Sequence, residues 1–500
     1  MDRQSVNRIA LIEGLSERTI ALFAPSWRWM LVIAGCGMLY LSIRQISPAS
    51  GTLDLKMMLT GVIMTTAALA AFYTATRPSM PERLRAWWQG LPPLLRWRGW
   101  RAILTIWLLL ASWESFNAQW QDAARGHYPN DAIAYVHEDA DLLIRGQNPY
   151  TADGAFWEAA ARWPRSLATP LLGSENFGSN IHRYPSGRHI GTVLAYQLNN
   201  PAARGNDFDP ATVHNYPAGV ILLAAPFAFL GLRSIIWLNF FMLLLLIGVI
   251  VAYTPKGARA PMAIALLANP LVPMFTLFMN FDVVSIVFVL LAWQWLRDRP
   301  VLSGLALGFA CAVKQVAWFF VPFYLIEVAR RQGLRAAAKQ GAWLGLAFAV
   351  PNLPFILQAP GAWAHSMLIP MADPMFPLGF GPIILMLGKA LPVLPAKVWT
   401  VLELGSWIAL LVYQWRRKAT TSDGLLFALV PLWLSWRSPM NYFALVPMLV
   451  LWLTARMHDA PQSQAATTRA AAEDELATLD DPFFDLPDFA PPEPELAGVK

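Results

Sequence analysis

The sequence predicts an all-α polytopic membrane protein, a bundle of about 11–13 transmembrane helices with one large external loop that carries juxtamembrane helices. Hydrophobic residues make up 56% of the chain and charged residues only 14%. At least ten separate runs approach the roughly 20 apolar residues that a bilayer core requires. The runs lack the period-2 alternation of membrane strands, which disfavours a β-barrel. A polar, aromatic-rich segment over residues 116–215 interrupts the apolar runs, and a loop of this size usually builds a site.

The chain begins with an amphipathic lead over residues 1–26, which carries both arginines and acidic residues before the first apolar run near Trp27: Asp2, Arg3, Arg8, Glu13, Glu17 and Arg18. No small-residue cleavage site follows a short apolar region, so we expect a cytoplasmic lead and not a signal peptide. Residues 27–98 are expected to form two transmembrane helices and a basic cytoplasmic loop.

Basic clusters predict the topology, because lysine and arginine concentrate on the cytoplasmic side of membrane proteins. The clusters that we place there are Arg77 to Arg101, Arg330 to Lys339, and Arg416 to Lys418. Residues 116–215 then face the periplasm or the cell exterior of a cell (inner) membrane protein. Between residues 217 and 326 the number of membrane crossings is harder to reconcile with the positions of the basic residues. The segment 217–254 is expected to contain one re-entrant or interfacial piece.

The formal charge of +6 combines two opposed parts. Residues 457–500 contain ten acidic residues against Arg469 and Lys500, which leaves +14 on the rest of the chain. This basic excess reflects membrane topology, so no nucleic-acid partner is expected. The tail lacks the apolar content to fold alone, and we expect a disordered acidic cytoplasmic tail.

The start of the external loop predicts a helix that runs to Gly146, with Asn130 or Asp131 as its cap. Helical spacing places Asp131, Tyr135 and Asp139 on one face. A carboxylate at the start of such a helix is suited to act as a general base, and equally suited to be an ordinary N-cap.

Three ionisable residues in or beside apolar runs converge on the side predicted to carry the large loop: Asp282, Lys314 and Arg437. An ionisable group in a span costs roughly 2.5–3.5 kcal/mol on insertion scales, so it usually has a function or a pairing partner. These residues therefore bind a charged substrate, or they snorkel to the interface or form structural ion pairs.

Several segments together resemble a known family. They are the Asp-Tyr pair with its helix closing in GQNPY, then NYPAG, MNFD, AVKQ, PNLPF and MNYF, in this order over roughly residues 100–455. This order resembles the polyprenyl-phosphate-sugar-dependent membrane glycosyltransferases of the C-type (GT-C) fold. The nearest group is glycosyltransferase family eighty-seven, which includes polyprenol-phosphomannose-dependent mannosyltransferases. Ala218, Asn280 and Gln315 depart from the motifs of that family.

The resemblance implies a GT-C-like core over residues 99–456 and a direct displacement at the anomeric carbon of a sugar. Asp131 is then the catalytic base. Lys314 and Arg437 are candidates to stabilise the departing phosphate, with Tyr216 as a hydroxyl donor, and Asp282 either holds Lys314 or contacts a sugar hydroxyl. The full set of substrate-binding residues expected is Tyr135, Tyr216, Asn280, Asp282, Lys314, Arg437 and Asn441.

Other clusters in the loop allow two interpretations each. Asp139 and Asp141 superficially match a metal-binding pair, but on a helix they point about 200° apart, and we expect neither a metal nor another cofactor. The group His182, Arg183, Tyr184, Arg188 and His189 lines a sugar or phosphate site, or it is a solvated face near anionic headgroups. Trp120, Trp157 and Trp163 fit an interfacial belt or a platform for sugar stacking.

The function expected from the sequence is the transfer of a sugar, with mannose favoured, from a polyprenyl phosphate donor to an external glycan or glycolipid acceptor. Membrane lipid is the surrounding partner. A transporter or lipid flippase also needs intramembrane charges, although we find none of the internal repeats common in transporters. A catalytically silent assembly partner is the third alternative, and the acidic tail would suit that role.

Overall fold

The structure is a computed structural model of the whole chain. It describes residues 27–46, 55–77, 80–90, 98–128, 130–152, 155–182, 184–205, 207–208, 214–277, 281–372, 375–417 and 422–457. The amphipathic lead 1–26, nearly all of the acidic tail, and the candidate residues Arg183 and Asn280 lie outside these ranges.

The described part of the chain is all-α apart from two very short strands, as the sequence predicts. The first half contains α2 (Trp27–Ile46), α3 (Leu55–Ala75), α4 (Glu82–Gly90), α5 (Arg98–Ala124), α6 (Asp131–Ile144), α7 (Ala155–Ala159), α8 (Gly187–Asn199), α9 (Ala218–Phe229) and α10 (Ile236–Ala252). The second half contains α11 (Arg259–Leu267), α12 (Asp282–Trp295), α13 (Pro300–Val313), α14 (Phe320–Gln332), α15 (Leu334–Gln358), α16 (Pro360–Ala372), β1 (Leu378–Gly379), α17 (Ile383–Leu387), α18 (Ala396–Arg416), α19 (Gly424–Phe427), α20 (Val430–Trp433), β2 (Arg437–Ser438) and α21 (Val446–Met457).

Three of the described helices are long and apolar enough to cross a membrane, judged by length and composition. They are Lys56–Ala75 in α3, α15 and α18. Seven further apolar helices have 10–17 residues, among them α10, α12 and α13. The membrane-length helices α15 and α18 carry exposed large hydrophobic side chains, for example Leu357 at 74% and Val401 at 69%, as lipid contact would require.

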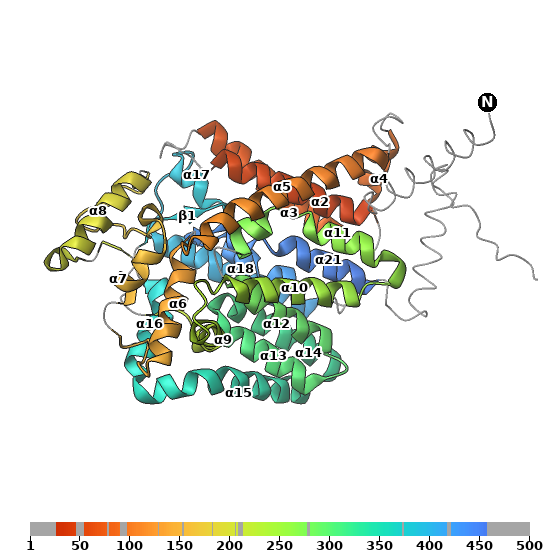
Figure 1. Cartoon of the computed structure of the whole chain (residues 1–500). Helices are drawn as coiled ribbons and strands as arrows, with labels where there is room; N and C mark the ends of the chain where they lie inside the picture. The colour runs from red at the N-terminus through yellow and green to blue at the C-terminus, as the bar shows by residue number, and fades with distance from the viewer. Residues whose placement is uncertain are drawn as a thin grey trace, which may run out of the picture.

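The helices form a bundle with two distinct ends (Figure 1). The long helices α2, α5, α10, α15 and α21 run along it, whereas α6, α7, α8, β1 and α17 gather at one end, which we call the loop end. Helices α4 and α11 lie toward the opposite end. The candidate residues of the external loop therefore share one end of the bundle with β1.

Helices α2 and α3 form a hairpin that is part of the bundle. The Ser42 hydroxyl donates to the carbonyl of Gly61 at 3.0 Å and lies 3.1 Å from the Thr65 hydroxyl. Helix α3 also contacts α17 and α21, so the two N-terminal helices pack directly on the rest of the chain. In the basic segment that follows, α4 is a short helix with no buried residue.

The segment 217–254, in which we expected a re-entrant or interfacial piece, forms two helices. Helix α9 has only 12 residues and packs mainly along α6, whereas α10 contacts α12 in the bundle. The turn between them is fixed to the loop end, because the Tyr128 hydroxyl accepts the amide proton of Ile235 at 2.9 Å. Helix α9 thus packs against α6, and it is shorter than the three helices that are long enough to cross a membrane.

Helix breaks place polar residues inside the bundle. Helix α13 ends at Val313 and a 3₁₀ turn starts at Gln315, so Lys314 lies at the predicted break. Residues 434–445 separate α20 from α21 and contain β2, which pairs in parallel with β1. A third break precedes Asp282, the first residue of α12.

Candidate active site at the loop end

Asp131 begins α6, but it is not the helix cap. The Asn130 side chain fills that role by accepting the Ile133 amide proton at 3.4 Å. The Asp131 carboxylate instead accepts a hydrogen bond from the Thr169 hydroxyl at 3.1 Å. Of the two roles that the sequence left open, the N-cap therefore belongs to the neighbouring residue, and the Asp131 carboxylate is available for other contacts.

Burial raises the pKa of Asp131 above its ordinary value, while the Thr169 hydrogen bond and the positive charge of Arg437 act in the opposite direction. The residue as a whole is partly exposed. A carboxyl group with a raised pKa has one of the properties required of a general base near neutral pH.

Arg437, far along the chain, lies near enough to Asp131 for its charge to lower the pKa of that carboxyl group. It lies in β2, opposite Leu378 of β1. Gly379 permits the close approach, because its φ of +147° is unfavourable for other residues and a Cβ there would collide with the Ser438 backbone. Arg437 Nη1 is buried and has no hydrogen-bond partner among the described residues.

Tyr184 is the third member of this group. Burial raises the pKa of its hydroxyl, the charge of Arg437 lowers it, and the charge of Asp131 raises it. Its ring packs edge-on against Phe376, with centroids 5.6 Å apart. One residue of the polar cluster 182–189 thus belongs to the site of Asp131, whereas Arg188 and His189 are exposed on α8.

A second polar group joins the three helix breaks. Lys314 Nζ lies 2.7 Å from Asp282 Oδ1, and the Asn441 side chain donates to Asp282 Oδ2 at 2.7 Å. Lys314 and Asp282 are 4% and 2% exposed, so the pair is buried. Lys314 also faces the Tyr216 ring at 5.6 Å, within the range of a cation–π contact. Asp282 therefore holds Lys314, one of the two roles that the resemblance allowed.

The segment around Tyr216 is fixed by three distant residues. The Gln315 side chain donates to the Asn215 carbonyl at 2.7 Å, and the Tyr150 hydroxyl donates to the Tyr216 carbonyl at 2.8 Å. The Asn352 side chain accepts the Ala218 amide proton at 3.0 Å. Residues from several of the segments that resemble the family thus lie close together. Three of them, Gln315, Tyr150 and Asn352, form hydrogen bonds with backbone groups around Tyr216.

Tyr135 has different surroundings from Asp131. It is 7% exposed and stacks on Trp163, with centroids 5.9 Å apart and planes 28° apart, and it also contacts Phe156. Trp163 is itself 2% exposed, so it forms neither an interfacial belt nor a sugar platform. This face of α6 packs an aromatic core, which explains its aromatic composition without a ligand.

Asp139 and Asp141 diverge, as the helical spacing predicts. Asp139 Oδ2 lies 2.5 Å from His214 Nδ1, whereas Asp141 Oδ2 accepts from Arg162 at 2.7 Å. No group of three or more metal-ligating side chains occurs among the described residues. The two carboxylates have separate partners and separate roles.

Sequence reasoning missed Thr169 and His214. Neither belongs to a motif, and each acts only because the fold brings it against a residue of α6 that lies 38 or 75 positions away. No local signal in the sequence identifies them.

An apolar groove of about 200 Å³ lies between α3, α18 and the last helices of the chain. It is lined by Leu69, Phe72, Tyr73, Leu410, Leu426, Phe427, Leu429, Val430, Trp433, Phe443 and Val446. Trp433 is the last residue before the 434–445 break that carries Arg437 and Asn441, and Phe443 lies within this break. An elongated apolar ligand with a polar end would fit this combination.

The site has two parts at the loop end: Asp131 with Thr169, Arg437 and Tyr184, and Lys314 with Asp282, Asn441 and Tyr216. Comparison of the chain with protein-family models, with curated proteins and with solved structures finds no match.

Proposed function

We propose that this chain is an integral membrane glycosyltransferase with a GT-C-like bundle of about 11–13 transmembrane helices. It transfers a sugar, with mannose favoured, from a polyprenyl phosphate to a glycan or glycolipid acceptor. In this proposal the loop 116–215 faces the periplasm or cell exterior, and the acidic tail is cytoplasmic.

The observation that carries the proposal is the combination of Asp131 and Arg437. A direct displacement needs a base for the acceptor hydroxyl and a cation for the departing phosphate. The carboxyl pKa of Asp131 is raised, and Arg437 has a guanidinium nitrogen without a partner among the described residues. The charge of Arg437 lowers the pKa of Asp131, which supports the assignment of both groups to one site.

In the proposed reaction the acceptor hydroxyl gives its proton to the Asp131 carboxylate while its oxygen bonds to the anomeric carbon. The bond from this carbon to the phosphate oxygen breaks, and its electron pair leaves with the polyprenyl phosphate. Arg437 donates hydrogen bonds to the phosphate as its negative charge grows. Tyr184, next to both groups, is suited to contact the sugar.

Lys314 has a secondary part in this mechanism. Its charge is already offset by Asp282 at 2.7 Å, so it offers less stabilisation to a phosphate than Arg437 does. In this mechanism Lys314 holds the Tyr216 ring in place. It also adds, at longer range, to the positive electrostatic potential around the phosphate of the donor.

The apolar groove supports a lipid-linked donor. Its side chains are apolar, it involves the membrane-length helices α3 and α18, and Trp433 and Phe443 connect it to the Arg437–Asn441 break. A polyprenyl chain in this groove would direct its phosphate toward Arg437.

The test is sugar transfer by the purified full-length protein in liposomes, with radiolabelled polyprenyl phosphate mannose as donor and a membrane lipid extract as acceptor source. Asp131→Asn should lower the rate by about 10²–10⁴, the usual contribution of a general base. Asp298→Asn, the same change at an exposed position after α12, should leave the rate unaltered.

Full activity in Asp131→Asn would refute the proposed mechanism. Movement of labelled lipid across the liposome membrane without transfer would favour the transporter or flippase alternative. Absence of both activities in the unsubstituted protein would favour the silent assembly partner.

A further inference from the structure

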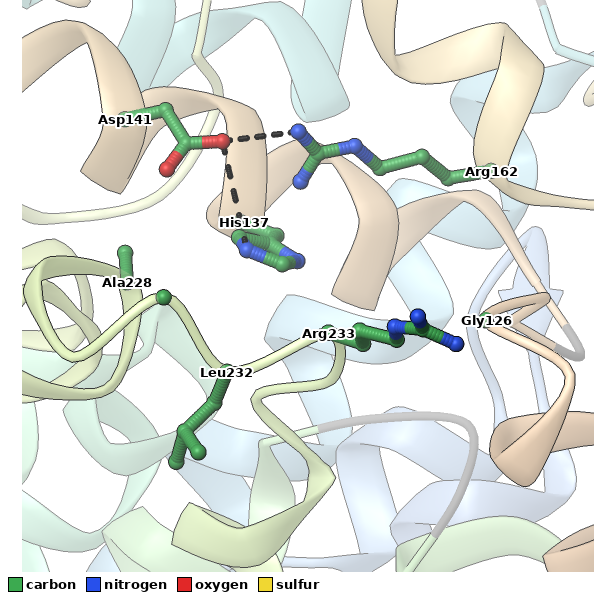
Figure 2. A pocket seen from close by; sticks show the side chains of 8 residues that line it. Gly126, His137, Asp141, Arg162, Ala228, Leu232 and Arg233 are labelled. Carbon is green, nitrogen blue, oxygen red and sulfur yellow. Dashed lines mark hydrogen bonds and ion pairs between the residues drawn. The ribbon is translucent and has the colours of Figure 1, made fainter.

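A polar cleft of about 360 Å³ is lined by His137 and Asp141 of α6 among others, and Asp131 is not part of its lining (Figure 2). It separates α6 from the turn between α9 and α10. Its lining residues are Gly126, His137, Asp141, Arg162, Ala228, Gly231, Leu232 and Arg233. None of these residues takes part in the proposed sugar transfer.

The lining of this cleft has an excess of hydrogen-bond donors. Arg162 donates to Asp141 at 2.7 Å through Nη2, and the same nitrogen lies 3.4 Å from Oε2 of Glu138, which is outside the lining. Arg162 Nη1 has no hydrogen-bond partner among the described residues. Arg233 is exposed, and no ion pair or hydrogen bond joins its side chain to another described residue. Among the residues that line the cleft, two arginines therefore face one carboxylate.

His137 supplies a further donor. Burial and the charge of Arg162 lower its pKa to about 4, so the ring is neutral at pH 7. The Tyr128 hydroxyl lies 2.7 Å from His137 Nδ1 and accepts the Ile235 amide proton, so we assign the Tyr128 proton to the bond with Nδ1. The imidazole proton is then on Nε2, 3.9 Å from Asp141 in the lining of the cleft.

The cleft also borders an exposed apolar surface. Phe229 and Leu230, next to its lining residues Ala228 and Gly231, are 76% and 71% exposed. Side chains of this kind contact lipid readily, and basic pockets beside membrane helices bind phosphate headgroups.

We propose that this cleft binds a phosphate group, held by Arg233, Arg162 and His137 Nε2. The apolar rim favours the headgroup of an anionic membrane lipid over free phosphate as its source. This inference does not depend on the proposed sugar transfer, because it uses different residues.

The experiment measures bound lipid on the full-length protein by native mass spectrometry after reconstitution in phosphatidylcholine nanodiscs with or without phosphatidylglycerol. A parallel arm titrates the detergent-solubilised protein with inorganic phosphate. Arg233→Gln is the test variant, since no described contact of the fold is lost with it. Arg165→Gln, at an exposed position outside the lining of the cleft, is the matched control.

We expect phosphatidylglycerol to be retained by the unsubstituted protein and by Arg165→Gln, and about tenfold weaker retention by Arg233→Gln, as for loss of a charged hydrogen bond. His137→Gln should weaken retention as well. If Arg233→Gln weakens the binding of inorganic phosphate but not that of phosphatidylglycerol, the result supports the phosphate site and identifies its ligand as a free anion. Binding of both probes that is equal in Arg233→Gln and Arg165→Gln would overturn the proposal.

Discussion

His214 Nδ1 lies 2.5 Å from Asp139 Oδ2, and both side chains are completely buried. This pair joins α6 to the end of the loop, where the His214 ring also contacts the rings of Tyr150 and Tyr216. It therefore fixes the segment that presents Tyr216 to Lys314. Burial raises the pKa of the Asp139 carboxyl group, and the neighbouring His214 lowers it. The imidazole of His214 therefore stabilises the buried carboxylate.

Breaking this pair should destabilise the protein strongly. Replacing His214 with Leu leaves the Asp139 carboxylate buried without its partner, which typically costs about 3–5 kcal/mol. Thermal unfolding in detergent should show a clear fall in Tm for His214→Leu. The double variant with Asp139→Leu should recover much of it, because no polar group is then left unpaired. Equal Tm values for the single and the double variant would argue against this role.

The pH dependence of sugar transfer should reflect Asp131. The base acts only when ionised, and burial raises its pKa above the ordinary value of about 3.9. Lowering the pH should therefore reduce kcat/KM at a higher pH than for an ordinary carboxylate. Thr169→Val removes a hydrogen bond that lowers this pKa, so it should shift the acidic limb to still higher pH. Thr192→Val, an exposed change on α8, should leave the profile in place, and an identical shift there would contradict the assignment.

The pair Lys314–Asp282 allows a structural role to be separated from a binding role. Lys314→Met leaves Asp282 buried and uncompensated, at a cost of about 3–5 kcal/mol. Adding Asp282→Asn removes that charge while an amide oxygen remains to accept from Asn441, so Tm should recover. Sugar transfer should stay low in the double variant, because the proposed contribution of Lys314 to the donor is still missing. Recovery of both stability and transfer would show that the pair is purely structural.

Gly379 should be needed to position Arg437. Gly379→Ala places a Cβ against the Ser438 backbone at a φ of +147°, which should cost about 1–3 kcal/mol and separate β1 from β2. Transfer activity should fall because Arg437 moves relative to Asp131. Gly405→Ala in α18, where a Cβ meets nothing within 4 Å, is the control and should raise stability slightly. Unchanged activity in Gly379→Ala would contradict this positioning.

Local features of the fold were predictable where local chemistry decides them. The helix after Asn130, its end near the positive-φ Gly146, and the breaks at Lys314 and before α21 all follow from capping, glycine and polar residues in the sequence. The cap itself was ambiguous, because Asn130 and Asp131 are both good N-cap residues and only the backbone geometry selects Asn130. The role of Tyr135 was not predictable, because helical spacing gives a face but not what packs against it.

By itself, the sequence determined the helical class, the order of the polar breaks and the types of residue available for chemistry, since these depend on hydrophobic periodicity and local propensity. Only the tertiary structure decided the pairs. It neutralised Lys314 with Asp282, placed Arg437 where its charge acts on Asp131, and gave Thr169 and His214 their partners on α6. The reason is physical: a buried charge requires a compensating group, and which distant residue supplies it depends on how the helices pack.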